Sequence, residues 1–302
     1  MKPAPIVLFT YNRPWHTQQT VEALQKNELA DLSDLIIYSD GSKDEDDRKN
    51  VQAVRDYLKN IDGFKSAKII EQERNRGLAA SIISGVTEVV NKYGKIIVLE
   101  DDLVIAPCFL KFMNEALEYY INDKKVMQIS GHMFDVNITA ATDAVLLPFT
   151  TSWGWATWKR AWEAFNPSMS SGYAKLKNDK ALQTNFNLQG AYNYFDMLKL
   201  QAKGKIDSWA IRWYLSVFTL DGLTLYPVQS LIKNIGFDGS GTHCKSSSSY
   251  HYSKRLHSFS VPNINFPDIS LNRDAYSQII QYLNSQRSFK AKLRAVFSGL
   301  KG

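Results

Sequence analysis

The segment Ile96-Ile97-Val98-Leu99-Glu100-Asp101-Asp102 passes from four apolar residues directly to three consecutive acids. A short apolar run of this kind is typical of a buried strand, and the acids mark the point where the strand reaches the edge of its sheet. Adjacent carboxylates repel one another, so the fold must offset them with a cation or with strong hydrogen-bond donors. Carboxylate oxygens at a strand end suit Mg²⁺ or Mn²⁺, with substrate phosphate oxygens completing the coordination shell. The alternative to a metal site is that the three acids form a turn exposed to solvent.

The first 105 residues repeat the same alternation of strand and helix. Apolar runs at 6–9, 35–38, 67–70 and 96–99 predict strands, and the segments 14–29, 44–60 and 77–92 predict helices between them. This order predicts an α/β fold with a Rossmann-like, mostly parallel sheet and helices on both faces.

Polar groups follow each of these predicted strands. They are Thr10 to Arg13, Asp40 to Ser42, Asn75 to Gly77 and Glu100 to Asp102. In open α/β sheets, ligands bind outside the carboxyl ends of the strands. The sequence therefore predicts a single site at this edge, and it favours a metal site over a solvated turn for the three acids.

Composition excludes several other classes of protein. The chain has 302 residues, 44% hydrophobic and 22% charged, which is ordinary for a globular protein. Two cysteines cannot form a dense disulfide framework, and neither a secretion signal nor an apolar run of membrane-spanning length is apparent, so a cytoplasmic location is expected. The net charge of +6 comes largely from residues 287–302, so no nucleic-acid partner is expected.

Several motifs together resemble a known superfamily. The segment Val98 to Asp102 resembles the metal-binding acidic motif of GT-A glycosyltransferases. Thr10-Tyr11-Asn12-Arg13-Pro14, Asp40-Gly41-Ser42 and Asn75-Arg76-Gly77-Leu78 resemble its nucleotide-binding strand ends, in the style of the large inverting family 2. The Glu-Asp-Asp spelling, the Trp-Gly-Trp block at 153–155 and Asp-Ser-Trp at 207–209 more closely resemble the N-acetylglucosaminyltransferase I type.

This resemblance covers roughly residues 5–245, and it implies a GT-A fold. Residues 1–105 would form the nucleotide-sugar-binding half, and residues 106–265 would form the acceptor and catalytic-base half of the same domain. Residues 266–302 would form a C-terminal helical region.

The resemblance also implies roles for the residues at the strand ends. Asp102 would bind the metal, Asp101 would lie on the ribose side, and Glu100 would face the donor sugar or a metal-bound water. Asp40 would hydrogen-bond the base, typically uracil. Three residues would lie along the nucleotide, namely Thr10, Tyr11 and Arg13. Arg76 would contact the base or the diphosphate, unless it is a surface arginine in a turn.

Inverting transfer needs a general base that deprotonates the acceptor hydroxyl. Asp207 is the candidate, because Trp209 and Trp213 follow it and apolar neighbours raise the pKa of a carboxyl group. The alternative is that Asp207 is the N-cap of a helix. The resembling family has Asp-Asp-Trp where this chain has Ser208 in second place, so a base displaced by one position stays open.

The second half contains further candidate site residues. Trp153 and Trp155, which flank a glycine, are a possible platform for the donor sugar or the acceptor, whereas the helical spacing of Trp155, Trp158 and Trp162 predicts core packing. His243, in a Gly/Ser-rich loop, is a possible metal or diphosphate ligand. His132 is expected to be a packed histidine rather than an acceptor contact.

Secondary structure is less regular beyond residue 105. The pattern predicts helices at 107–122 and 190–203 and a further aromatic helix after Ile206-Asp207-Ser208-Trp209. It predicts strands at 126–130 and 145–147, and a polar loop or lid at 166–186.

The sequence thus predicts a metal-dependent inverting glycosyltransferase. Its donor would be a nucleotide diphosphate sugar, with UDP-GlcNAc as an example, and its acceptor a hydroxyl of a glycan or of a lipid-linked molecule, as in polysaccharide assembly. Two alternatives stay open: a non-catalytic carbohydrate-binding relative, and a sugar nucleotidyltransferase, which normally shows a Gly-rich basic loop after its first strand.

The tail at 287–302 has a basic face and an apolar face, so it would lie peripherally on the inner face of a membrane. Packing on its own domain or on a partner subunit is the alternative. The oligomeric state is not predicted.

Overall fold

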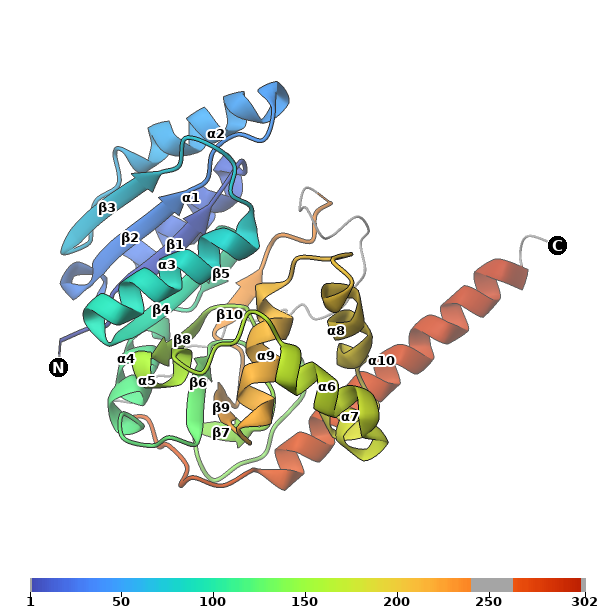
Figure 1. Ribbon diagram of the computed structural model, residues 1–302. Helices are drawn as coiled ribbons and strands as arrows, with labels where there is room; N and C mark the ends of the chain where they lie inside the picture. Colours follow the sequence, from blue (N-terminus) through green and yellow to red (C-terminus); the bar gives the residue numbers. More distant parts are fainter. Residues whose placement is uncertain (1, 240–262, 300–302) are drawn as a thin grey trace.

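The computed structural model describes residues 2–239 and 263–299, and the side chains of residues 2–239 and 263–287. Eight strands form the main sheet, namely β1 (Ile6–Thr10), β2 (Asp34–Ser39), β3 (Ser66–Glu71), β4 (Lys95–Glu100), β6 (Val126–Ser130), β7 (Ala144–Leu147), β8 (Trp155–Trp158) and β9 (Leu223–Pro227). Their order across the sheet is β3-β2-β1-β4-β8-β6-β9-β7 (Figure 1). Only β7 and β8 run against the other strands of this sheet, so the sheet is mostly parallel, as predicted. A separate antiparallel pair joins β5 (Leu103–Ile105) to β10 (Ile232–Asn234).

The chain changes direction across the sheet between β1 and β4. It first moves outward from β1 to β2 and β3, and then returns to place β4 on the other side of β1. The register pairs Phe9 with Glu100 and Thr10 with Ser39, so the carboxyl ends of three strands lie level with one another. A crevice at such a reversal is the usual ligand site of a doubly wound sheet.

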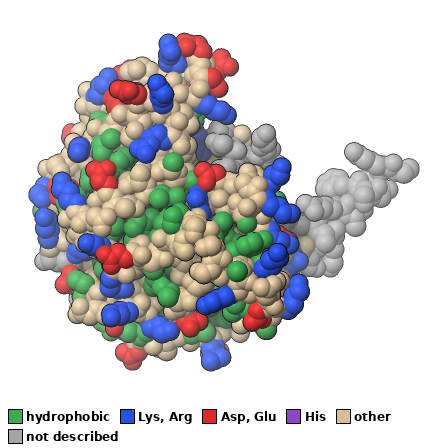
Figure 2. All heavy atoms as spheres, in the orientation of Figure 1, with side chains coloured by type: hydrophobic (Ala, Val, Ile, Leu, Met, Phe, Trp, Pro, Cys, Tyr) green, Lys and Arg blue, Asp and Glu red, His purple; other side chains and the backbone are tan. Residues whose placement is uncertain are grey.

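Helices cover both faces of the first half of the sheet. On one face α1 (Pro14–Gln25) packs beside α2 (Glu45–Leu58), whereas α3 (Leu78–Tyr93) packs on β1 and β4 with α5 (Lys159–Trp162) and α9 (Trp209–Thr219) beside it (Figure 1). Right-handed crossovers produce this arrangement when the chain reverses after β3. Basic and acidic side chains are interspersed over most of the face seen in Figure 2.

The polar stretch at 166–186 is mostly helical, so the prediction of a loop was wrong, whereas its role as a lid stays a prediction. It forms α6 (Ser170–Asn178) and α7 (Lys180–Phe186). The Asp179 carboxylate caps α7 by accepting a 2.9 Å hydrogen bond from the Leu182 N–H, and Leu176 and Phe186 are fully buried. A few well-placed apolar residues therefore anchor helices that are otherwise polar.

The tryptophan block is also organised differently from the prediction. Trp155 and Trp158 lie in β8, and Trp162 ends α5, so the three residues do not share one helical face. All four residues of β8 are buried, because β8 is covered on both faces. A strand of this kind lacks alternation, and apolar spacing alone does not distinguish it from a helix. The core packing predicted for the three tryptophans is nevertheless observed.

The remaining helices belong to the second half, namely α4 (Phe109–Tyr119), α8 (Tyr194–Ala202) and α10 (Arg273–Gly299), and a short 3-10 helix η1 spans Ala30–Leu32 in the first half. The start of α10 packs into the second of two hydrophobic clusters through Ala275, Ile279 and Leu283. Its C-terminal part projects from the body in Figure 1. Within the described residues, no helix combines the length and the hydropathy needed to cross a membrane.

Candidate active site

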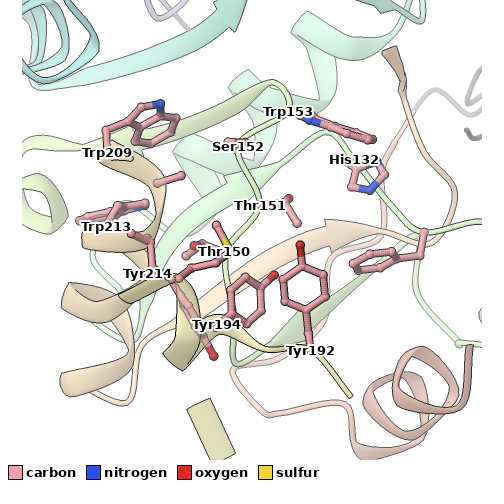
Figure 3. Close-up of a pocket in the computed structure, with 14 residues that line it drawn as sticks. His132, Thr150, Thr151, Ser152, Trp153, Tyr192, Tyr194, Trp209, Trp213 and Tyr214 are labelled. Carbon is pink, nitrogen blue, oxygen red and sulfur yellow. The ribbon is translucent and has the colours of Figure 1, made fainter. Parts of the chain in front are cut away.

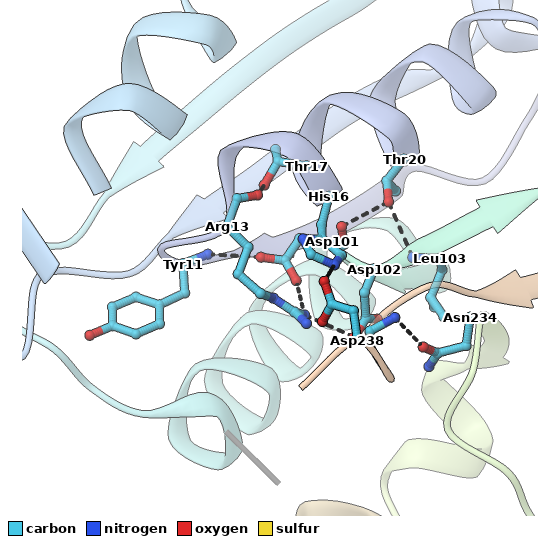
Figure 4. Close-up of polar contacts among 11 residues, drawn as sticks. Tyr11, Arg13, His16, Thr17, Thr20, Asp101, Asp102, Leu103, Asn234 and Asp238 are labelled. Carbon is cyan, nitrogen blue, oxygen red and sulfur yellow. Dashed lines mark hydrogen bonds and ion pairs between the residues drawn. The ribbon is translucent and has the colours of Figure 1, made fainter. Parts of the chain in front are cut away.

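The three acids lie where the sequence predicts, at the carboxyl end of β4 beside β1. We call Glu100, Asp101 and Asp102 the acid cluster. The Arg13 guanidinium reaches it from the loop after β1: its Nη2 lies 2.5 Å from Asp101 Oδ1 and 2.8 Å from Asp102 Oδ2 (Figure 4). The Tyr11 N–H donates to Asp101 Oδ2 at 3.3 Å. Backbone and side chain of one loop therefore hold two of the three carboxylates.

Electrostatics within this cluster show how strongly the charges interact. Burial opposes the charge on Arg13, but the neighbouring carboxylates outweigh it and raise the pKa of Arg13 above its usual value. Burial, together with the charges of Asp102 and Asp101, raises the pKa of Glu100 to about 8. Burial also raises the pKa of Asp101, although Arg13 works in the opposite direction. One guanidinium therefore does not fully compensate three acids, and the site favours additional positive charge.

The peptide after β10 closes the cluster from the other side. The Ile235 N–H donates to the Asp102 carbonyl at 2.8 Å, and Gly236 lies directly against the Asp102 side chain. A Cβ at residue 236 would come within 2.1 Å of Asp102 Oδ2, so any other residue here would force the Asp102 carboxylate to move. On the same segment, Asp238 Oδ2 lies 3.1 Å from His16 Nε2 of α1 (Figure 4).

Asp40 organises the neighbouring strand ends. Its Oδ1 accepts hydrogen bonds from the N–H groups of Gly41 (2.9 Å) and Arg76 (2.8 Å), and its Oδ2 accepts one from Gly77 (3.0 Å). Asn75 Nδ2 adds a 2.9 Å bond to the Gly41 carbonyl. The buried carboxylate therefore ties the turn after β3 to the end of β2, while the Arg76 side chain is exposed.

Two further predicted residues lie beside this turn and the acid cluster. Thr10 is buried at the end of β1, and its Oγ1 has no hydrogen-bond partner among the described residues. The Tyr11 hydroxyl donates to Asp47 of α2 and accepts a 3.1 Å bond from the Lys43 N–H. Tyr11 thus spans the space between the acid cluster and α2.

Comparison with known protein families agrees with this geometry. Residues 6–132, which include β1 to β4 and the acid cluster, match the family described as glycosyl transferase family 2. This chain carries a glycosyl transferase family 2 domain. It is accordingly a glycosyltransferase, and its sheet is consistent with a GT-A fold. No curated protein matches the chain.

Three solved structures are similar to this glycosyltransferase at 11% identity each. They are the mannosyltransferase PcManGT from Pyrobaculum calidifontis in complex with GDP-Man and Mn²⁺ (TM-score 0.38, 73% of this chain and 74% of that one), a cytidylyltransferase from Leptospira borgpetersenii serovar Hardjo-bovis (0.34, 55% and 64%) and TarS from S. aureus (0.35, 76% and 36%). This chain thus spans about a third of the length of TarS. Similarity at this level indicates neither donor nor acceptor, and none of the three is described as an N-acetylglucosaminyltransferase I.

The acid cluster fits a divalent metal in part. Its donors are carboxylate oxygens, which suit Mn²⁺ and Mg²⁺, and the absence of a side chain at Gly236 avoids a clash with Asp102 Oδ2. Among the described residues, however, no three acid, histidine or cysteine side chains are grouped as a complete metal site. Such a partial site suits a metal that also takes substrate phosphate oxygens and water.

The two tryptophans predicted to contact sugars occupy different environments. Trp155 is 1% exposed and stacks on Trp209, with ring centroids 5.1 Å apart, which favours core packing. Trp153 is partly exposed and lines a pocket; its ring centroid lies 4.5 Å from that of His132 and 5.5 Å from that of Phe237. The glycosyltransferase therefore offers Trp153, rather than Trp155, to a ligand.

Asp207 lies at the start of α9, but not in the environment that was predicted. Its side chain is 70% exposed, and Oδ1 lies 2.6 Å from Arg212 Nη2. The N-cap of α9 is Ser208, whose Oγ accepts a 3.4 Å hydrogen bond from the Ile211 N–H. The alternative role of Asp207 as the cap was therefore wrong, and the apolar surroundings that were predicted for its carboxylate are not found.

The two histidines considered in the sequence analysis are His243 and His132. His243 lies outside the described residues. His132 is buried, as predicted, but it also lines the pocket beside Trp153.

Sequence reasoning missed the tyrosines Tyr192 and Tyr194 in this pocket. The concentration of aromatic residues in Ala191-Tyr192-Asn193-Tyr194-Phe195 was the sequence feature that could have indicated them.

Proposed function

We propose that this glycosyltransferase transfers a sugar, with inversion, from a nucleotide diphosphate donor to a hydroxyl of a glycan or lipid-linked acceptor, using Mn²⁺ or Mg²⁺. The observation that carries the proposal is the acid cluster at the strand reversal, with Arg13 between Asp101 and Asp102. Asp102 would hold the metal, which when bound neutralises charge on the departing diphosphate. Arg13 would orient both carboxylates and extend its positive charge toward the same phosphates.

A uridine donor is supported by the hydrogen-bonding capacity of Asp40. A carboxylate offers about four acceptor positions. Backbone N–H groups already occupy two on Oδ1 and one on Oδ2, which leaves one position on Oδ2. Uracil presents a single ring N–H on its pairing edge, so the remaining position suits it. Thr10 and Tyr11 would line the path from the base toward the diphosphate.

Asp207 is proposed as the general base that takes the proton of the acceptor hydroxyl as its oxygen attacks the anomeric carbon. Its exposed carboxylate is accessible to an acceptor. Asp207 also lies two residues before Trp209, which lines the pocket. Arg212 would fix the orientation of the carboxylate through the 2.6 Å contact.

Donor hydrolysis in the absence of an acceptor tests the first part of this proposal. UDP-sugars are incubated with and without Mn²⁺, and UDP release is measured for the wild type, Asp102→Asn and Asp56→Asn. Asp56 is an exposed acid of α2 that pairs with Lys59, so its variant matches the charge change at a distance. We expect Mn²⁺-dependent release from the wild type and the control, and a loss on the order of 100-fold in Asp102→Asn. Equal hydrolysis by Asp102→Asn would overturn the assignment of the metal ligand.

A further inference from the structure

The second half of the molecule contains a cavity of about 200 Å³ lined mainly by aromatic side chains (Figure 3). We call it the aromatic pocket. One wall is the segment 150–153, another is the start of α9, and a third is formed by Tyr192, Tyr194 and Met197 on and before α8. A cavity of about 150 Å³ is sufficient for a benzene ring, so the aromatic pocket has room for one six-membered ring.

Its walls are of two kinds. Trp213 and Tyr214, at the bottom of the pocket, have their polar atoms hydrogen-bonded to other protein groups. Trp213 Nε1 donates to Gln128 Oε1 at 2.6 Å, and the Tyr214 hydroxyl donates to the Phe186 carbonyl at 3.0 Å. These side chains are structural, as is Trp209, which stacks on the core. They form a rigid floor.

The outer tyrosines differ from this floor. Tyr192 is 38% exposed, and within the described part of the chain no residue hydrogen-bonds the hydroxyl of Tyr192 or Tyr194. In Figure 3 the Tyr192 hydroxyl points across the pocket toward Thr151. The outer wall therefore presents hydroxyl groups that are available to a ligand.

The aromatic pocket lies next to the acid cluster, and the link is Trp153. In the antiparallel pairing of β8 with β4, Trp155 faces Val98, so the same register continued by two residues places Trp153 level with Glu100. The Trp153 ring also contacts Phe237, which follows the glycine that packs on Asp102. A group bound in the pocket is thus a neighbour of the donor end of the sheet.

The lining indicates the class of ligand. Among the described residues that line the pocket, none is Asp, Glu, Lys or Arg, so this lining does not offer the charges that a diphosphate or a nucleotide requires. An alkyl chain would suit the rings but would leave the hydroxyls of Tyr192 and Ser152 without a partner from the ligand. A pyranose ring has apolar C–H faces for the aromatic rings and hydroxyls around its edge for the polar groups.

We propose that the aromatic pocket is the subsite for one neutral pyranose ring of the acceptor, with Tyr192 as its polar contact and Trp153 between it and the donor. This inference rests on the proposed function, since it names the substrate class that the second half binds. An acceptor that begins with a sugar follows from it, rather than one that presents only a lipid chain.

Binding of simple glycosides tests the inference without an acceptor of known identity. The probes are methyl glycosides of glucose, galactose, mannose and N-acetylglucosamine, with cyclohexanol as an apolar ring of similar size. Saturation-transfer NMR detects contact, and quenching of tryptophan fluorescence gives the affinity. We expect at least one glycoside to bind more tightly than cyclohexanol, with saturation reaching its ring C–H protons.

Variants at the exposed tyrosine locate the binding. Tyr192→Ala should weaken the glycoside about tenfold, and Tyr192→Phe by less, because the phenyl ring stays and one hydrogen bond is lost. Leu200→Ala is the control, since Leu200 is exposed on α8 and does not line the pocket. No glycoside binding, preferential binding of cyclohexanol, or equal affinity in Tyr192→Ala would each overturn the subsite.

Donor hydrolysis on the same samples separates this inference from the proposed function. Hydrolysis should be equal in the wild type and in Leu200→Ala, because both keep the acid cluster and Leu200 lies outside the pocket lining. A wild type that binds glycosides but never hydrolyses a nucleotide sugar would contradict the donor chemistry and leave the pocket standing. A wild type that hydrolyses the donor but binds none of the glycosides would contradict the subsite and leave the donor chemistry supported.

Discussion

The acid cluster and the aromatic pocket lie at one edge of the same sheet, but their side chains are held in different ways. In the acid cluster, a single Arg13 bridges two carboxylates, and the loops after β1 and β10 close around them. In the aromatic pocket, the floor consists of aromatic side chains whose polar atoms are hydrogen-bonded within the protein. This floor supports an outer wall of tyrosines with available hydroxyls. One region is built to balance charge, and the other to bind a neutral surface.

This difference indicates a division of labour between the two halves. Charge in a partly buried site is costly unless it is paired, so the acid cluster should be sensitive to any change in charge. The pocket relies on shape and on a few hydrogen bonds, so its single contacts should each contribute modestly. Variants that affect one region and not the other therefore test whether the two regions act separately.

Asp207→Asn should have the largest effect on transfer and little effect on either region alone. Loss of a general base lowers turnover by about 100- to 10,000-fold. Donor hydrolysis without acceptor and glycoside binding should both stay near wild type, because Asp207 belongs to neither region. Transfer is measured from the donor to whichever glycoside binds. Asp196→Asn is the matched control, since Asp196 is an exposed acid paired with Lys199 on α8. Near-normal transfer by Asp207→Asn would remove its assignment as the base.

Arg13→Ala should be the most destabilising change in the acid cluster. The Arg13 side chain is only 16% exposed, and its loss leaves the Asp101 and Asp102 carboxylates without their partner. We expect the free energy of unfolding to fall by about 3 kcal/mol, measured by urea denaturation. Arg48→Ala is the control, because its ion pair with Glu45 is highly exposed, and it should cost less than about 1 kcal/mol.

Mn²⁺ provides a second measurement on the same variant. If the metal and Arg13 both compensate the acid cluster, Mn²⁺ should raise the melting temperature of Arg13→Ala more than that of the wild type. Equal shifts in both proteins would mean that the metal and the guanidinium do not share the Asp102 carboxylate. In that case the charge balance described above would be wrong.

The first half of the fold and the acid cluster could be predicted because their signals are local. Residues 6–9 and 96–99 are short apolar runs followed by polar residues, and parallel strands bring those polar residues to one edge. Capping of α9 was harder, since Asp207 and Ser208 are both good N-caps and the choice depends on where the helix begins.

The aromatic pocket could not be predicted in the same way. Its lining comes from residues 132–134, 150–153, 192–197 and 209–214, which only the tertiary fold brings together. Aromatic residues are also common in cores, and Trp155 and Trp153 differ only by two positions in sequence. Burial decides between them: Trp155 is covered on both faces of β8, whereas Trp153 lies just beyond the strand.

Asp40→Asn should affect the nucleotide end of the donor region more mildly. Both carboxylate oxygens accept a backbone N–H, so either orientation of the amide places its NH₂ against at least one of those donors. We expect a loss of about 1–3 kcal/mol in unfolding free energy and weaker binding of UDP. Glycoside binding should not change, and Asp56→Asn again serves as control. Unchanged UDP affinity in a folded variant would separate Asp40 from base recognition.

Removal of residues 288–302 should have the smallest effect on the two regions. Among the side chains that the structure describes, the buried contacts of α10 come from Ala275, Ile279 and Leu283, and the Arg287 guanidinium hydrogen-bonds the Gly190 carbonyl, so these contacts precede the cut. Unfolding free energy should change by less than about 0.5 kcal/mol, and donor hydrolysis and glycoside binding should be retained. The removed residues carry basic and apolar side chains, and each basic residue near an anionic surface contributes about 1 kcal/mol. The truncated chain should therefore lose binding to phosphatidylserine vesicles that the full chain binds. Equal vesicle binding by both chains would contradict peripheral attachment through this tail, whereas a loss of stability on truncation would favour packing of the tail against the protein.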